Sequence, residues 1–214
     1  MTSFGGLQQD LYVGLIALLL QPDFQRLGSA AVPQLQGSLL AGCILGVVDG
    51  ALTQHLQGLG EIHALGREQL DLSHPESIRA VMQSLQPAIV INAAAYTAVD
   101  QAESEEALAL RINAEAPGIL AEEAVKIGAS LIHYSTDYVF DGSKQGAWTE
   151  DDPVSPLSAY GHSKLAGERA IAATGVAHLI LRTSWVYGLH GKNFLLTMLR
   201  LAQSRESLSI VDDQ

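Results

Sequence analysis

Tyr160 and Lys164 are the two residues whose types and spacing could do chemistry. They stand four apart, so on a helix both side chains lie on one face. The ammonium of Lys164 favours the phenolate, and we expect it to lower the pKa of Tyr160 from about 10 towards neutral pH. A tyrosine of this kind can protonate a carbonyl oxygen during hydride transfer. A hydroxyl at the end of a preceding strand, Thr136 or Ser135, can hold that oxygen.

Spacing alone does not establish a catalytic pair, because an exposed tyrosine beside a solvated lysine gives the same pattern. The position of the pair favours catalysis. It opens a predicted helix that follows Pro153, Pro156 and an acidic loop, and before that loop a strand ends in Ser135-Thr136-Asp137. A proton donor beside a hydroxyl is the geometry expected for acid catalysis. We therefore favour the catalytic interpretation.

Strands alternate with helices from Glu61 onward. Ala88–Asn92 is a continuous apolar run, typical of a strand buried on both faces. The expected strands are Glu61–Leu65, Ala88–Asn92, Ser130–Tyr134, His178–Arg182 and Leu208–Val211, and the expected helices are Pro75–Gln86 with Ser73 at its cap, Glu103–Arg111, Pro117–Ile127 ended by Gly128, Ser163–Thr174 and Phe194–Ser204. This alternation predicts an α/β fold, a Rossmann-like doubly wound parallel sheet with helices on both faces. Ligands bind beyond the carboxyl ends of such strands. The residues expected at that edge are Asn92, Ser135, Thr136 and Thr183 to Trp185.

A dinucleotide-binding fold needs a glycine-rich loop between its first strand and first helix. Here Cys43–Leu45 is the candidate strand end and Ala51–Gln57 the candidate helix. Between them stand only two glycines, Gly46 and Gly50, and Asp49 places a negative charge where a pyrophosphate should lie. We therefore interpret the loop as damaged, keep the two glycines as candidate cofactor contacts, and expect weak or undetectable binding of a dinucleotide by this chain.

Three other segments could contact a dinucleotide. The small side chains of residues 93–95, after the strand that ends at Asn92, would let a flat cofactor approach the backbone, or they simply allow tight helix–strand packing. Asp71 could bind an adenine edge or belong to an ordinary turn. Arg67 could meet a 2′-phosphate or be a lone surface arginine.

Trp185, near a strand end, could stack on a substrate ring or pack in the core.

Composition limits the classes of function. The 214 residues carry a formal net charge of −11, which argues against binding nucleic acid or an anionic membrane. The single cysteine, Cys43, excludes an internal disulfide and is consistent with a cytoplasmic protein. Two apolar stretches, Leu11–Leu20 and Leu39–Val48, are about half the length that spans a bilayer, so we expect buried core segments. The histidines show no metal-ligand spacing, and we predict no metal site.

Four segments of the chain resemble the extended short-chain dehydrogenase/reductase family. They are Ile91 to Asp100 (INAAAYTAVD), Ser135 to Gly142 (STDYVFDG), Pro156 to Lys164, and Arg182 to Gly188 (RTSWVYG). The first two strings are specific, whereas the Tyr-x-x-x-Lys spacing is shared by the whole superfamily. The resemblance extends over residues 58–214. The resemblance implies an unmatched N-terminal extension, residues 1–40, and a NAD(P)-binding Rossmann-like domain, residues 41–214, from which most of the C-terminal substrate lobe would be missing.

The resemblance implies roles for the matching residues. Tyr160 would donate the proton, Lys164 would support it and bind the nicotinamide ribose, and Thr136 would hold the reacting oxygen. The residues implied to line the nucleotide are Asp71, Leu72, Ala93, Ala94 and Ala95, and those implied to face a sugar nucleotide are Asp137, Tyr138 and Trp185.

The implied reaction is reduction of the 4-keto group of dTDP-4-dehydro-L-rhamnose to dTDP-L-rhamnose, a precursor of cell-surface polysaccharide, with hydride from NADPH or NADH. A magnesium ion and a homodimer are further implications of the resemblance. Two other interpretations stay open. The chain could be a truncated or non-catalytic homologue that binds a partner, or another sugar-nucleotide epimerase or dehydratase of the superfamily.

Overall fold

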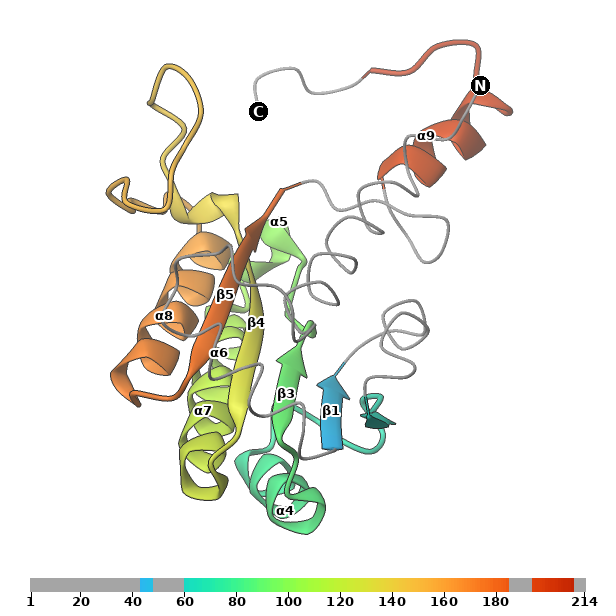
Figure 1. Ribbon diagram of the computed structural model, residues 1–214. Helices are drawn as coiled ribbons and strands as arrows, with labels where there is room; N and C mark the ends of the chain where they lie inside the picture. Colours follow the sequence, from blue (N-terminus) through green and yellow to red (C-terminus); the bar gives the residue numbers. More distant parts are fainter. Residues whose placement is uncertain (1–42, 48–59, 185–193, 210–214) are drawn as a thin grey trace.

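A parallel sheet of five strands forms the centre of the protein. The structure, a computed structural model, describes residues 43–47, 60–184 and 194–209 (Figure 1). Its strands are β1 (Cys43–Val47), β2 (Glu61–Ala64), β3 (Ile89–Asn92), β4 (Ser130–Thr136) and β5 (His178–Thr183). They lie in the order β2-β1-β3-β4-β5, and every neighbouring pair is parallel. The predicted α/β class and parallel sheet are confirmed.

The strand order reverses between β1 and β3. From β1 the chain moves to β2 on one side and then returns to β3 on the other, where Val47 pairs with Asn92. This is the doubly wound topology, and ligands of such sheets bind at the reversal point, beyond the carboxyl ends of the strands. The segments that follow β3 and β4 therefore lie where a ligand would be expected.

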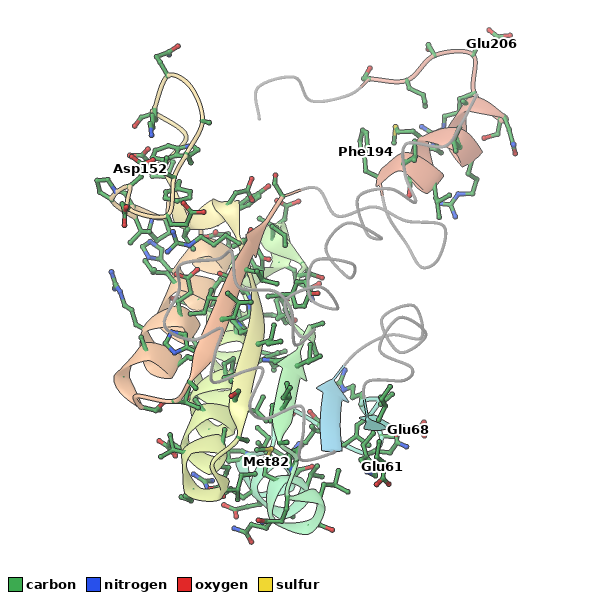
Figure 2. All side chains as sticks on the ribbon, in the orientation of Figure 1. Glu61, Glu68, Met82, Asp152, Phe194 and Glu206 are labelled. Carbon is green, nitrogen blue, oxygen red and sulfur yellow. The ribbon has the colours of Figure 1, made fainter. Side chains whose placement is uncertain are left out.

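Three helices pack side by side against one face of the sheet (Figure 1). The helices of the described residues are α4 (Pro75–Leu85), α5 (Val99–Ala102), α6 (Glu106–Leu110), α7 (Ala116–Ile127), α8 (Ala159–Ala173) and α9 (Phe194–Ala202). Helix α7 packs between α4 and α8. The main core lies between these helices and strands β3 and β4, and Met82 of α4, labelled in Figure 2, is fully buried in it. The helix predicted at Ala51–Gln57 lies outside the described residues.

The centre of the sheet follows the predicted pattern. All four residues of β3 are buried, as expected for a strand with a continuous apolar run. Helix α7 ends at Gly128 with φ of 72°, a left-handed cap that glycine adopts without steric cost. Both predictions are confirmed.

One helical segment is longer than predicted. We expected helices at Glu103–Arg111 and Pro117–Ile127, but α6 continues through a π-helical turn, η1 (Arg111–Glu115), directly into α7. Proline has no N–H for the carbonyl four residues earlier, which here belongs to Asn113. The wider π turn accommodates this missing bond without ending the helix.

Three local predictions were wrong. Ser73 does not cap α4, because its hydroxyl and its N–H both donate to Asp71, and the N-cap is His74, which makes no side-chain cap bond. Helix α8 begins four residues earlier than predicted, because the Ser158 side chain accepts from the N–H of Gly161 and caps it there. Leu208 and Ser209 form no strand, and the rest of Leu208–Val211 lies outside the described residues.

A long loop, residues 140–158, extends beyond the carboxyl edge of the sheet before α8, and Asp152 marks it in Figure 2. Helix α9 carries exposed apolar side chains, including Phe194 and Leu199. Within the described ranges, no helix combines the length and the apolar character needed to cross a membrane.

Replacing Gly167 by alanine should destabilise the fold. A Cβ atom at Gly167 would lie 2.0 Å from the carbonyl oxygen of Asn113, a backbone atom of η1 that cannot easily retreat. We expect Gly167→Ala to lower the free energy of unfolding by about 1–3 kcal/mol or more, measured by urea denaturation. Gly66→Ala is the matched control, since its Cβ would meet only the Gln69 side chain at 3.5 Å. Equal stability of the two variants would contradict the close approach of α8 to η1.

Candidate active site at the carboxyl edge of the sheet

The first turn of α8 is held in place by two side chains. The hydroxyl of Ser158 accepts from the N–H of Gly161 at 3.1 Å, and Glu103 accepts from the N–H of Ala159 at 2.8 Å. Both bonds satisfy donors that a helix N-terminus leaves unpaired. They fix the position of Tyr160, the second residue of the helix.

Gly161 lets this turn approach the segment after β4, where η2 (Asp137–Val139) forms a 3₁₀ turn. A Cβ at Gly161 would lie 2.4 Å from the carbonyl oxygen of Tyr138. The rings of Tyr138 and Tyr160 meet edge to face, with centroids 5.6 Å apart. The contact places the Tyr160 hydroxyl in hydrogen-bonding reach of Thr136, the last residue of β4.

Tyr160 holds its proton more tightly than a free tyrosine. It is 9% exposed, and burial raises the pKa of its phenol above 10, because a buried phenolate loses hydration. The hydrogen bond with Thr136 lowers the pKa in part, while the nearby Asp137 carboxylate and Tyr138 raise it. Our expectation that Lys164 lowers the Tyr160 pKa is wrong for this geometry, since the ammonium makes its bonds elsewhere.

Lys164 lies on the same helix as Tyr160 but directs its ammonium towards β4. Its Nζ donates to the carbonyl oxygen of Tyr134 at 2.6 Å and lies 3.3 Å from Nε2 of His133. The side chain is 1% exposed. Burial lowers the pKa of Lys164 to about 8, partly opposed by the negative charge of Glu168.

The two hydroxyls left open by the sequence have different partners. The Thr136 hydroxyl donates to Asp137 at 3.1 Å and accepts from the N–H of Tyr138 at 3.2 Å. The Ser135 hydroxyl is buried and donates to Glu168 at 2.6 Å. Thr136 is therefore the hydroxyl beside Tyr160, and Ser135 belongs to a separate ion-pair cluster.

Glu168 connects α8 to β5 and to the long loop. Arg182 of β5 donates to both of its carboxylate oxygens, at 3.0 and 2.7 Å, a bidentate pairing with strong directional preference. The same guanidinium lies 5.1 Å from the ring centroid of Phe140, which stacks on Trp148 at 4.4 Å. This chain of contacts anchors the loop that leaves η2.

The candidate cofactor residues after β3 lie at the strand-order reversal. Asn92 ends β3, Ala93 is exposed, and Ala94 and Ala95 are partly buried. Ala94 packs against the main core, which fits the tight helix–strand packing that the sequence left open. A role of this segment in binding a dinucleotide stays a prediction.

The segment after β2 is more constrained than predicted. The Asp71 carboxylate accepts from the N–H and the hydroxyl of Ser73, at 2.8 and 2.7 Å, and these bonds lower the Asp71 pKa. Arg67 is largely exposed and lies 3.7 Å from Asp71. The side chain of Leu72 is buried in the main core, so only its backbone can face a nucleotide.

Gly46 is not in a loop. It lies within β1, where it pairs with Ala64 and Ile91, so the strand continues past the end predicted at Leu45. Gly50 and Trp185 lie outside the described residues, and their roles stay predictions.

Sequence reasoning missed Asn113, which joins three parts of the site. Its side chain accepts from the N–H of Tyr96 at 2.8 Å and donates to the Tyr96 carbonyl and to Ser163, both at 3.0 Å. It thereby ties the loop after the alanines to α8. No pattern in the sequence singled it out, because Arg111 and Glu115 on either side of it are polar as well.

In residues 43–47, 60–184 and 194–209, no group of three or more histidine, cysteine, aspartate or glutamate side chains could hold a metal ion. The magnesium ion implied by the resemblance has no support in that part of the chain.

A family model described as the RmlD substrate binding domain matches residues 39–214. A curated protein from Burkholderia thailandensis, named dTDP-4-dehydrorhamnose reductase, is 50% identical over 169 residues, which cover 79% of this chain and 57% of that protein. The chain thus spans little more than half the length of this relative.

Solved structures agree with this similarity. A dTDP-4-dehydrorhamnose reductase from Clostridium acetobutylicum superposes with a TM-score of 0.76 at 38% identity, covering 80% of this chain and 62% of the other. A dTDP-4-dehydrorhamnose reductase from Bacillus anthracis, solved in complex with NADP, gives a TM-score of 0.74 at 39% identity, covering 80% and 63%.

The burial of Lys164 should make stability depend on pH. Its pKa is about 8 in the fold against 10.5 for a free lysine, so between these values the unfolded chain binds more protons. The free energy of unfolding should therefore rise with pH from about 8 to 10.5, with a slope approaching about 1.4 kcal/mol per pH unit. Lys164→Met should lack this rise, as measured by urea denaturation at several pH values.

Lys126→Met is the control, because Lys126 is an exposed lysine on α7. It should keep the rise that Lys164→Met loses. Parallel stability curves for wild type and Lys164→Met would show that the buried ammonium is not destabilised by the fold.

Proposed function

Since the chain belongs to the RmlD substrate-binding-domain family, we propose that it carries the site of an NAD(P)H-dependent keto-sugar reductase. The proposed reaction is reduction of the 4-keto group of dTDP-4-dehydro-L-rhamnose to dTDP-L-rhamnose. The observation that carries this proposal is the buried Tyr160 hydroxyl beside Thr136 at the carboxyl edge of the sheet, with Lys164 one turn further along α8. The names of the similar reductases support the choice of substrate.

The proposed cofactor is NADPH or NADH, and it supplies the hydride when bound. The backbone of Ala93, Ala94 and Ala95 would lie against it, and Lys164 would bind its ribose. Asp71 and the backbone of Leu72 would meet the adenine, with Arg67 available to a 2′-phosphate. The NADP complex of the Bacillus anthracis protein supports a dinucleotide. Gly46 and Gly50 would contribute only through the backbone.

The proposed proton donor is Tyr160. Its raised pKa keeps the phenol protonated at neutral pH, so it can deliver a proton to the carbonyl oxygen of the substrate as that oxygen becomes an alkoxide. Thr136 would hold the same oxygen through its hydroxyl. Because proton transfer is most efficient when the donor pKa lies near the working pH, an approach of the Lys164 ammonium would increase the rate.

The remaining parts of the proposal concern the substrate and the assembly. Asp137 and Tyr138, next to Tyr160, would face the dTDP-sugar together with Trp185. We also propose a cytoplasmic location, with which the single cysteine is consistent, and a homodimer, which rests on the family resemblance alone.

A second candidate is a non-catalytic homologue that binds a partner. The sequence between Gly46 and Gly50 favours it, because it carries Asp49 and only two glycines where a pyrophosphate would bind. An epimerase or dehydratase of the same superfamily is a third candidate. Neither of these would reduce the keto-sugar.

Turnover in excess cofactor separates these candidates. With dTDP-4-dehydro-L-rhamnose and saturating NADPH, we expect loss of nicotinamide absorbance, weak cofactor affinity, and a kcat about 100- to 10,000-fold lower in Tyr160→Phe. Nicotinamide fluorescence should show unchanged NADPH affinity in this variant. His162→Gln, an exposed position in the same helical turn, is the control for kcat. Absence of turnover at any NADPH concentration would contradict the reductase and leave the non-catalytic homologue and the epimerase or dehydratase.

A further inference from the structure

His133 is a buried titratable residue that the proposed reaction does not use. It lies in the middle of β4 with 0% of its surface exposed. Its two ring nitrogens face two different side chains. Nε2 lies 3.3 Å from the ammonium of Lys164, and Nδ1 lies 3.1 Å from the amide nitrogen of Asn92. The imidazole therefore bridges α8 and the end of β3.

The Lys164 ammonium requires an acceptor on the ring. In the described part of the chain its hydrogen-bond partners are the Tyr134 carbonyl and His133. A neutral imidazole accepts through one nitrogen only, and a protonated imidazole accepts through neither. If Lys164 is charged, His133 must be neutral, with its proton on Nδ1.

The environment keeps His133 neutral. Burial and the adjacent Lys164 charge lower the pKa of His133 well below 6.5. The charged and titratable groups on α8 near His133 are Lys164, Tyr160 and Glu168. Arg182 of β5 is bound to Glu168, and Asp137 of η2 faces Tyr160. The negative charge of Glu168 favours the Lys164 ammonium, which in turn disfavours a second positive charge on His133.

The Asn92 amide lies on the other side of the ring from Lys164. Its Oδ1 is buried and has no hydrogen-bond partner, while its Nδ2 faces Nδ1 of His133. If Nδ1 carries the proton, two donors face each other and the amide oxygen stays unpaired, which is costly in the interior. A half-turn of the Asn92 amide removes the conflict between the two donors, because Oδ1 then accepts from Nδ1–H, and it moves the amide nitrogen to the position in which Oδ1 has no partner.

We propose that His133 is a positioning residue that holds the Lys164 ammonium against the sheet through Nε2, while Asn92, in its rotated orientation, fixes the proton on Nδ1. The line of hydrogen bonds runs from Lys164 to His133 and from His133 to Asn92, and each of these two bonds has one donor and one acceptor. The hydrogen-bond pattern stands by itself, but its consequence for catalysis rests on the proposed reductase function.

That consequence concerns the charge of Lys164. A hydrogen bond to a charged group stabilises the charge, so His133 keeps Lys164 protonated at pH values where burial alone would remove the proton. In the proposed reaction the Lys164 ammonium would stabilise the phenolate of Tyr160 only by approaching it, and a lysine that had lost its proton could not do so. His133 would thereby act on the reaction through Lys164, without touching the substrate.

Nitrogen NMR on the full chain with ¹⁵N-labelled histidine tests the pattern directly. Between pH 6 and 7.5 we expect His133 to show a protonated Nδ1 and an unprotonated Nε2 without titrating. The exposed His162 serves as the internal comparison. Its signals are identified by their loss in His162→Gln. A proton on Nε2 of His133, or a ring protonated on both nitrogens in this range, would overturn the proposal whether or not the chain reduces a keto-sugar.

Two matched variants test the hold on Lys164. Glutamine places its amide near the position of Nε2, whereas asparagine places it near Nδ1, so His133→Gln can keep an acceptor for Lys164 and His133→Asn cannot. With ¹³C-labelled lysine, we expect the Lys164 titration midpoint to fall by about one pH unit in His133→Asn and to stay near wild type in His133→Gln. Equal midpoints in wild type and both variants would overturn the role of His133.

If either variant fails to fold, the ring-nitrogen measurement on the wild type still decides the hydrogen-bond pattern. Where turnover is present, the basic limb of the kcat–pH profile should shift in the same direction as the Lys164 midpoint, with KM for NADPH moving less than kcat. A purely structural role for His133 would lower stability without moving either the midpoint or the profile.

Discussion

The approach of α8 to its neighbours is the constraint on which the site depends. Gly161 lets the first turn of this helix lie against the carbonyl of Tyr138, and Gly167 lets the next turns lie against the carbonyl of Asn113. The second carbonyl belongs to the π turn, four residues before Pro117, which has no N–H to offer it. The π turn, the proline and the glycine therefore belong to one packing arrangement. It brings Tyr160 to the end of β4 and places the Lys164 ammonium against the same strand.

Burial then sets the direction of the pKa shifts of Lys164 and Tyr160. Lys164 loses most of its hydration, and a backbone carbonyl and an imidazole replace it only in part, so its pKa falls to about 8. Tyr160 loses hydration too, and its pKa rises. The nearby buried carboxylate of Glu168 is already bound by Arg182 and Ser135. The interior thus contains charged groups with assigned partners, and beside them a Tyr160 phenol that keeps its proton.

Much of the fold followed from patterns in the chain, and the errors have specific causes. The continuous apolar run of β3 and the glycine after α7 predicted their elements correctly. The gap expected before Pro117 was wrong because a π turn absorbs the proline within a longer helix. The cap expected at Ser73 was wrong because Asp71, two residues earlier, binds its hydroxyl. Local propensity does not reveal which of two nearby polar groups a side chain will choose.

By itself, the sequence determined the parallel α/β class, the spacing of Tyr160 and Lys164, and the position of Thr136 at a strand end, because these depend on periodicity and on residues close in the chain. Only the tertiary structure decided where the lysine points and what surrounds it. His133 and Asn92 lie 31 and 72 positions before Lys164 in the sequence. Only the pairing of β3 with β4 and the packing of α8 on the sheet bring the three residues together. Hydration lost on burial depends on those distant neighbours, so the direction of both pKa shifts could not be deduced from the spacing of the pair.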